Sequence, residues 1–215
     1  MSAARPLVGG IFVGGRGLRM HGIAKGLLEA PDGVTIATRT KRLLDAAGAE
    51  CVLVGEHPAY ASLGVRALAD DPSAEGPLGG LLAFLAWAGE RVAIAIACDM
   101  PHIDASLVRR LVDAPPAPIV APRHEGLWDP LFARYDAARV LPVARSLAAR
   151  GERRLQRLLD AADAAPLELT AEERARLVDW DHPEDVGHTL PSRATASSSR
   201  QRSQFERTRG PPRRQ

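Results

Sequence analysis

Apolar and polar positions alternate along this chain in two kinds of block: short continuous apolar runs, and longer stretches with helical spacing. A continuous apolar run bounded by Gly, Pro or charged residues is typical of a strand that is covered on both faces. The run VAIAIAC, for example, carries no charged or amide side chain. Such runs predict strands at 6–14, 50–55, 65–69, 92–98 and 119–121.

Between these runs, apolar residues recur every three or four positions, which predicts helices that bury one face. Gly48 follows the first helix as a C-terminal cap, and Asp104 precedes the third as an N-terminal cap. Strands that alternate with helices predict a three-layer, Rossmann-like α/β domain with a mostly parallel sheet, which binds ligands at the carboxyl ends of its strands. Helices are predicted at 34–47, 78–88, 105–113 and 137–149, with shorter ones at 152–162, 171–177 and 183–187.

The net charge of +2 over 215 residues hides an asymmetry. Residues 188–215 contain seven Arg and one Glu, a net charge of +6, whereas the preceding residues contain 21 basic and 25 acidic side chains, a net charge of −4. The basic segment is poor in apolar residues, so burial cannot offset the entropy lost on ordering it. We therefore predict a folded domain at 6–187 and a disordered basic tail at 188–215. The tail contains no folded nucleic-acid motif, so we predict no specific nucleic-acid partner.

Other features of the sequence indicate where the protein resides and which chemistries lack support. The apolar run at 78–89 is too short to span a bilayer, and the N-terminus lacks the apolar segment of a signal peptide. We therefore predict a cytoplasmic protein with no membrane partner. Cys51 and Cys98 lie in apolar surroundings without CxxC spacing, which predicts two buried, reduced thiols. The six His lack H-x-x-x-H spacing and no G-x-S-x-G is present, so zinc binding and acyl transfer lack support.

The first loop is the strongest candidate for binding an anion. The predicted strand ends at Val13, Gly14 and Gly15, where backbone N–H groups without a nearby Cβ can approach a ligand closely. Arg19 and Lys25 follow, and Lys25 is one of only two lysines in the chain. The segment matches neither G-x-x-x-x-G-K-[ST] nor G-x-G-x-x-G, which favours a loop that holds a nucleoside triphosphate in another way. Taken alone, it fits an ordinary glycine turn with solvated basic side chains equally well.

A second candidate is Asp99, which directly follows the apolar run at 92–98 and precedes Pro101. A carboxylate at the carboxyl edge of a sheet suits Mg²⁺, which prefers oxygen ligands and the phosphates of nucleotides. The alternative is that Asp99 caps the next helix, but Asp104 is better placed for that role.

A third candidate is the segment DDPSAEGPLGG, which follows a predicted strand and opens a helix, with Pro77 near the first turn. Asp70 can hydrogen-bond a base or a ribose. Gly79 and Gly80 weaken the start of a helix unless something must approach it closely. The alternative is a polar loop before a helix that begins with proline.

Taken together, these segments resemble one known family. VGGRGLRMHGIAK, DDPSAEGPLGG and CDMP occur in the order of the family patterns A-G-G-x-x-x-R-M-G-x-D-K, D-x-x-x-x-x-G-P-L-x-G and C-D-x-P. Later, WDPLF, GERR and DWDHPED resemble its H-P-L-F, G-E-R-R and N-x-N-T-P-E-E segments. From about residue 7 to 187 the chain therefore resembles the nucleotidyltransferase domain of the molybdenum cofactor guanylyltransferases of the MobA type.

The resemblance implies transfer of a guanylyl group from GTP to the phosphate of the molybdopterin cofactor, with release of pyrophosphate. It implies that the backbone at Val13, Gly14 and Gly15 contacts the nucleotide. Carried over in the same way, Lys25, Asp70 and Asp99 bind the nucleotide, and Asp99 also holds Mg²⁺. Arg19 and Lys25 would neutralise the leaving pyrophosphate, so the implied catalytic residues are Arg19, Lys25 and Asp99. Molybdoenzymes or other cofactor-assembly proteins are the implied protein partners.

The chain departs from the family pattern at several positions. Ala24 stands where the family has Asp before the lysine, and His21 stands where it has Gly. Asp179 and Asp181 occupy the two Asn positions, where carboxylates would either strengthen metal binding or repel an anionic pterin. Arg153 and Arg154 either contact the pterin phosphate or are surface charges.

Other functions of the same fold therefore stay open. They are a cytidylyltransferase, a transferase for another small phosphate, and a non-catalytic module that binds nucleotide or cofactor. The pair Gly14-Gly15 favours guanine by resemblance, and Ala24 keeps the non-catalytic reading open.

Overall fold

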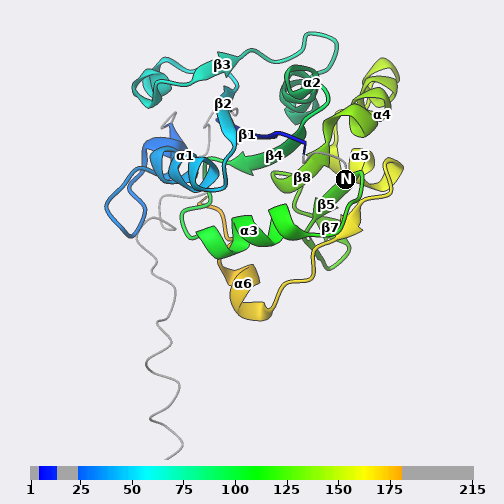
Figure 1. Ribbon diagram of the computed structural model, residues 1–215. Helices are drawn as coiled ribbons and strands as arrows, with labels where there is room; N and C mark the ends of the chain where they lie inside the picture. Colours follow the sequence, from blue (N-terminus) through cyan, green and yellow to red (C-terminus); the bar gives the residue numbers. More distant parts are fainter. Residues whose placement is uncertain (1–4, 14–23, 181–215) are drawn as a thin grey trace, which may run out of the picture.

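The computed structural model describes residues 5–13 and 24–180. A seven-stranded sheet with the strand order β3-β2-β1-β4-β8-β5-β9 forms its centre (Figure 1). The predicted helix at 183–187 and the predicted tail at 188–215 lie outside the described residues. The strands of this sheet are β1 (Leu7–Phe12), β2 (Glu50–Val54), β3 (Arg66–Leu68), β4 (Val92–Ala97), β5 (Ile119–Ala121), β8 (Phe132–Asp136) and β9 (Ala165–Pro166).

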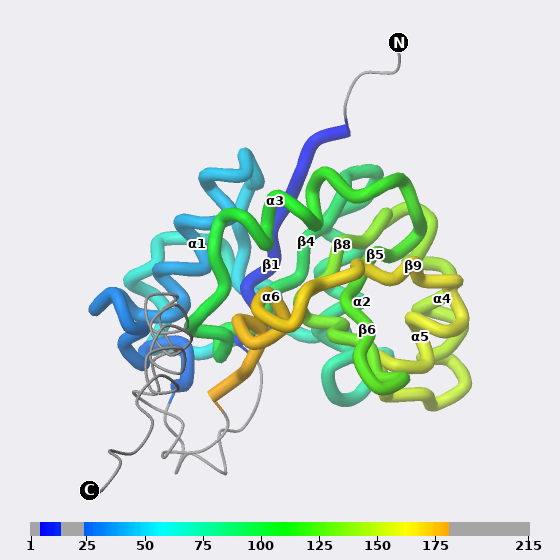
Figure 2. Tube along the Cα trace, turned by 90° about the horizontal axis from the view of Figure 1, so that it is seen from below, coloured from blue at the N-terminus to red at the C-terminus, as the bar shows by residue number. Residues whose placement is uncertain are grey.

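Helices cover both faces of the sheet, which confirms the predicted three-layer architecture (Figures 1 and 2). On one face, α1 (Ile36–Ala46) and α3 (Ala105–Asp113) bury Leu44 and Leu107 against Ile94 of β4. On the other, α2 (Pro77–Ala88), α4 (Ala137–Ala149) and α5 (Leu155–Ala161) pack their apolar side chains against β1, β2, β4 and β8. The remaining elements are α6 (Ala171–Ala175), two short 3₁₀ helices, η2 (Lys25–Leu27) and η3 (Pro58–Leu63), and a separate hairpin of β6 (Arg123–His124) and β7 (Leu127–Trp128).

The helix ends follow the predicted capping chemistry. The Asp104 carboxylate accepts the Leu107 N–H at 3.0 Å and so caps α3. Gly48 follows α1 with φ +78°, a left-handed conformation that glycine adopts without a steric penalty. The predicted helix at 152–162 begins later, at Leu155, because Gly151 lies in a turn with φ +76° and the next three residues have no regular secondary structure.

Two glycines inside β1 let the helices approach the sheet closely. A Cβ on Gly9 would lie 2.7 Å from Cδ1 of Leu44, on α1, and a Cβ on Gly10 would lie 2.9 Å from the ring of Phe84, on α2. Carbon atoms do not approach so closely without a shift of the side chain. The two glycines therefore fit α1 and α2 against opposite faces of the same strand.

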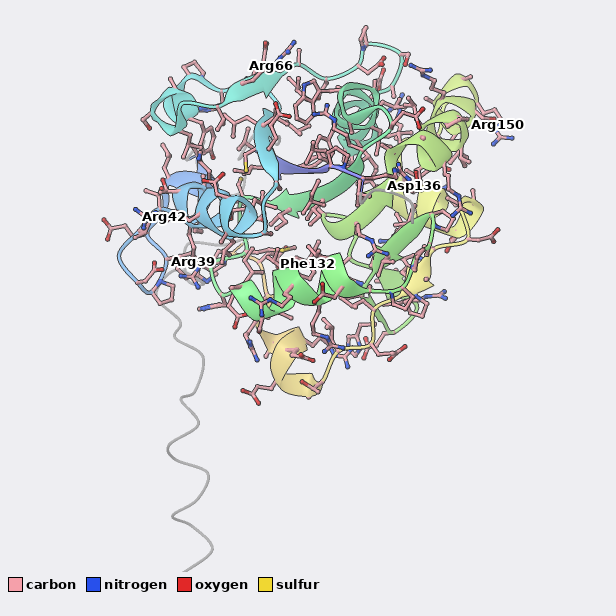
Figure 3. All side chains as sticks on the ribbon, viewed as in Figure 1. Arg39, Arg42, Arg66, Phe132, Asp136 and Arg150 are labelled. Atoms are coloured by element: carbon pink, nitrogen blue, oxygen red, sulfur yellow. The ribbon has the colours of Figure 1, made fainter. Side chains whose placement is uncertain are left out.

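The sheet is mostly parallel, as predicted, but one strand that sequence reasoning missed runs the other way. Strands β1, β2, β3 and β4 are parallel to one another, whereas β8 lies antiparallel between β4 and β5. The ends of β8, Phe132 and Asp136, are labelled in Figure 3. Its sequence, FARYD, mixes charged and apolar residues and so shows no continuous apolar run. The short strands β6, β7 and β9 were missed because two residues carry no periodicity.

Arg134, in the middle of β8, is 8% exposed and caps the C-terminal end of α3 from inside the protein. Its guanidinium donates hydrogen bonds to four carbonyl oxygens that lie at or just beyond that helix end. These four oxygens belong to Leu111, Val112, Ala114 and Pro115, and each lies 2.6–3.0 Å from a guanidinium nitrogen. A buried cation is therefore balanced by the carbonyl groups that a helix leaves without partners.

Two further predictions are tested by the fold. Both cysteines are free, and Cys98 is buried as predicted, but Cys51 is only partly buried because it lies near the start of β2, beside Asp45. Within the residues that the structure describes, no helix has the length and apolar character needed to cross a membrane.

Candidate active site

The candidate site forms at the carboxyl ends of β1 and β4. Val13 follows β1 and donates its N–H to the carbonyl of Val54 at 3.0 Å, and Cys98 follows β4 and donates to the carbonyl of Phe12 at 3.0 Å. Val13 and Asp99 therefore leave the sheet from neighbouring parallel strands, at the edge where such sheets bind ligands. Gly14, Gly15 and Arg19 lie outside the described residues, as does His21.

Lys25 and Asp99 meet at this edge. Lys25 begins η2, and its ammonium Nζ lies 3.2 Å from Oδ2 of Asp99. Their side chains are 18% and 21% exposed, so water screens this ion pair less than a pair on the surface. The structure thus brings together two residues that the sequence places 74 positions apart. Ala24, directly before Lys25, packs against the apolar cluster between the sheet, α1 and α3.

Asp70 lies beside the ends of β1 and β2, on the other side of the sheet. A Cβ on Gly80 would lie 3.1 Å from Oδ1 of Asp70 and 3.2 Å from Cγ1 of Val54. A Cβ on Gly79 would lie 2.6 Å from the carbonyl oxygen of Ala74. The close approach that these glycines permit is therefore made by the chain's own loop at 70–76. Asp70 is exposed, which leaves its carboxylate accessible to a ligand.

The GERR segment reaches the same loop. Arg153 forms an ion pair with Glu75, with 2.8 Å between Nη2 and Oε2, and Arg154 pairs with Glu152 at 3.1 Å. These side chains are mostly exposed apart from Glu152, so the ion pairs contribute little to stability. They nevertheless place Arg153 next to the segment that precedes α2.

Sequence reasoning did not show how close the segment at 178–180 lies to Asp99. The N–H of Trp180 donates to the backbone carbonyl of Asp99 at 2.9 Å. The Trp180 ring is buried against Ala30 and Ile36, and it contacts the ring of His102 edge to face. Asp179, directly before Trp180, is therefore held near the candidate site; Asp181 lies outside the described residues.

Asp129, in the WDPLF segment, was also missed as a site residue. It lies between β7 and β8, and burial, followed by the negative charge of Asp179, raises its pKa. His124 and Arg174 act in the opposite direction. The family pattern has His at this position, so only the fold reveals that a partly buried carboxylate here is exposed to the negative charge of Asp179.

We expect Asp129→Asn to stabilise the protein at neutral pH. Because folding raises the pKa of Asp129, the folded state holds this proton more tightly than the unfolded chain does, and ionised Asp129 lowers stability above the folded-state pKa. The variant should raise the Tm by about 1–3 °C at pH 7, with a gain that shrinks towards pH 4. Thermal unfolding monitored by circular dichroism between pH 4 and 8 measures the gain in Tm and its dependence on pH.

Asp136→Asn serves as a control of opposite sign. Its hydrogen bond from Arg5 lowers the pKa of Asp136, so this carboxylate contributes stability above its unfolded-state pKa and loses it as the pH falls through the folded-state value. This variant should lower the Tm at pH 7. An Asp129→Asn variant that is less stable than the parent at pH 7 would show that folding does not raise the pKa of Asp129.

The residues at this edge suit a cation that takes most of its ligands from water and from substrate, because few protein ligands are available. Within the described ranges 5–13 and 24–180, no three His, Cys, Asp or Glu side chains converge into a metal-binding group. Mg²⁺ commonly binds through one or two carboxylates and completes its shell with water and substrate phosphates. The Asp99 carboxylate is therefore the group at this edge that could hold such a cation, with the Lys25 ammonium 3.2 Å from it.

A cavity of about 730 Å³ lies elsewhere, between α3 and β9, and none of the predicted site residues lines it. It is walled by one side of α3, the prolines that follow that helix and the segment at 165–168. The candidate site is thus identified by the convergence of chain segments and charges at the sheet edge.

Comparisons with known proteins agree with this geometry. The chain is 36% identical over 199 residues to a probable molybdenum cofactor guanylyltransferase of Opitutus terrae, covering 86% of this chain and 96% of the relative. It is 32% identical over 179 residues to a molybdenum cofactor guanylyltransferase of Pseudomonas putida, covering 81% and 92%.

Among solved structures, the fold matches the molybdopterin-guanine dinucleotide biosynthesis protein A of Archaeoglobus fulgidus with a TM-score of 0.64 at 19% identity, over 83% of this chain and 94% of that one. The family model for the MobA-like NTP transferase domain matches residues 9–166, which include Val13, Lys25, Asp70 and Asp99. The chain is therefore a nucleotidyltransferase that belongs to the MobA-like NTP transferase family.

Proposed function

We propose that this protein transfers a guanylyl group from GTP to the terminal phosphate of the molybdopterin cofactor. The observation that carries the proposal is the Lys25–Asp99 ion pair at the carboxyl edge of the sheet, in a chain whose relatives are named as guanylyltransferases. A cation and a carboxylate side by side provide one group for phosphate oxygens and one for Mg²⁺.

The proposed reaction is an in-line displacement at the α-phosphorus of GTP. A phosphate oxygen of molybdopterin forms the new bond, the bond to the β-phosphate oxygen breaks, and pyrophosphate leaves. The attacking phosphate is already ionised near neutral pH, so the protein need not supply a general base. Catalysis then depends on positioning and on neutralising charge.

Each predicted residue has a defined task in this proposal. The backbone at Val13, Gly14 and Gly15 would hold the nucleotide, and Asp70 would hydrogen-bond its base or ribose. Lys25, together with Arg19, would neutralise the leaving pyrophosphate, and Asp99 would hold Mg²⁺. When bound, Mg²⁺ supplies a positive charge that stabilises negative charge on the phosphate oxygens.

The ion pair with Asp99 also offers Lys25 a carboxylate in place of the Asp that the family pattern has at the position of Ala24. Ala24 cannot orient the ammonium group, but Asp99 lies 3.2 Å from it and can do so from across the sheet edge. This contact favours an active transferase over a non-catalytic module. As such an enzyme the protein would act in the cytoplasm and deliver its product to molybdoenzymes or to other cofactor-assembly proteins.

One assay separates the candidate functions. Purified protein is incubated with Mg²⁺, molybdopterin and each of GTP, CTP, ATP and UTP, and both pyrophosphate and the dinucleotide product are followed. We expect release with GTP that requires molybdopterin. Release selective for CTP would instead identify a cytidylyltransferase, and nucleotide binding without release would indicate a non-catalytic module.

A further inference from the structure

Tyr60 lies between the two chain segments that carry the Lys25–Asp99 pair. Its hydroxyl accepts a hydrogen bond from the backbone N–H of Gly26, at 3.0 Å, and lies 3.9 Å from Sγ of Cys98. Gly26 directly follows Lys25, and Cys98 directly precedes Asp99. One buried hydroxyl thus contacts the immediate neighbour of each member of the pair.

The packing around this contact leaves little freedom. A Cβ on Gly26 would lie 2.9 Å from Cε1 of Tyr60 and 3.0 Å from Cβ of Cys98, so η2 is seated directly on both residues. Tyr60 is 2% exposed. Movement of η2 along the sheet edge would therefore require Tyr60 to move as well.

Tyr60 is itself held firmly by η3. The ring of His57 caps this 3₁₀ helix by accepting the Ala59 N–H at 3.2 Å, and it packs edge to face against the Tyr60 ring. Gly64 ends the helix with φ +63°, in the left-handed region. Burial raises the pKa of the Tyr60 hydroxyl above its usual value, so the group stays neutral and acts as a hydrogen-bonding group.

We propose that Tyr60 is a positioning residue that fixes the ammonium group of Lys25 beside the carboxylate of Asp99. It acts through the backbone of Gly26 on one side and through packing against Cys98 on the other. Its predicted effect on turnover rests on the proposed nucleotidyl transfer, whereas its effect on Lys25 does not.

The chain offers a direct probe because it contains only two lysines, Lys25 and Lys41. Reductive methylation with ¹³C-formaldehyde keeps the positive charge and labels both, together with the α-amino group. Lys41 pairs with Asp45 on the exposed side of α1 and so serves as an internal reference. The NMR signals are assigned with Lys41→Arg, and Asp99→Asn defines the signal of Lys25 in the absence of the Asp99 carboxylate.

In Tyr60→Phe, which keeps the ring but removes the acceptor, we expect the Lys25 methyl signal to shift towards its position in Asp99→Asn while the Lys41 signal stays in place. We also expect kcat for nucleotidyl transfer to fall about tenfold with little change in KM. A tenfold fall corresponds to an increase of about 1.4 kcal/mol in the activation free energy. Tyr135→Phe is the matched control, because it removes another buried hydroxyl, one that donates to the carbonyl of Pro130.

Gly26→Ala tests the same contact from the other side and provides a second variant if Tyr60→Phe does not fold. Its added Cβ must displace Tyr60 or η2, so the Lys25 signal should again move. A Lys25 signal that is unchanged in a folded Tyr60→Phe or Gly26→Ala variant would overturn the proposal. So would an equal shift in Tyr135→Phe, since it would reflect general loosening of the fold. If the parent protein shows no transferase activity, the NMR result alone decides the role of Tyr60.

Discussion

Replacing Asp99 with Asn should reduce nucleotidyl transfer by about 10³-fold, the loss expected when a central electrostatic contact of an active site is removed. The amide has nearly the same shape as the carboxylate but carries no charge. It therefore anchors Mg²⁺ poorly, and it leaves Lys25 without the negative charge that lies 3.2 Å from its ammonium group. Pyrophosphate release at increasing Mg²⁺ concentrations measures the effect, and circular dichroism shows that the variant is folded.

The chain contains a matched control for this substitution. Asp45 forms an ion pair with Lys41, with 2.7 Å between the charged atoms, on the exposed part of α1. Asp45→Asn removes a lysine–carboxylate pair of the same kind away from the sheet edge, so its activity should equal that of the parent. Transfer by Asp99→Asn within about threefold of the parent would contradict the proposed role of Asp99.

Replacing Arg134 with Met should have the largest effect on stability. Met has a similar length and can fill the apolar part of the space, but it donates no hydrogen bonds. The carbonyl groups at the end of α3 would then lose the buried guanidinium that binds four of them. Removing a buried cation and leaving its carbonyl acceptors without a donor costs about 3–5 kcal/mol. We expect the Tm to fall by about 10 °C, and urea unfolding to give the change in free energy.

Arg5→Met provides the comparison for Arg134. Arg5 forms a bidentate ion pair with Asp136 at the other end of the sheet, but its side chain is 38% exposed. Arg5→Met should therefore lower the free energy of unfolding by about 1 kcal/mol or less. If Arg134→Met were no more destabilising than Arg5→Met, the carbonyl groups at the end of α3 would have to be satisfied without the guanidinium. The folded fraction of Arg134→Met should keep its kcat, because Arg134 lies away from Lys25 and Asp99.

The sequence by itself determined most of the architecture. The parallel strands β1 and β4 are continuous apolar runs because both of their faces are covered, and that pattern is visible without any tertiary information. The helix caps at Asp104 and Gly48 depend on residues within one turn of the helix end, so local chemistry was sufficient to predict them. Because the three family motifs each follow a predicted strand, they also predicted that the candidate site lies at the carboxyl edge of the sheet.

Only the tertiary structure decided the features that depend on distant segments. β8 is buried by its neighbours β4 and β5, so its charged and aromatic residues hid it from a pattern based on hydrophobicity. Arg134 looks like a surface residue until α3 supplies the carbonyl groups that satisfy its charge. The same is true of the Lys25–Asp99 pair, of the influence of Asp179 on Asp129, and of Tyr60 between η2 and β4. Each is an interaction between segments far apart along the chain, and it is the folded sheet edge that brings them within reach of one another.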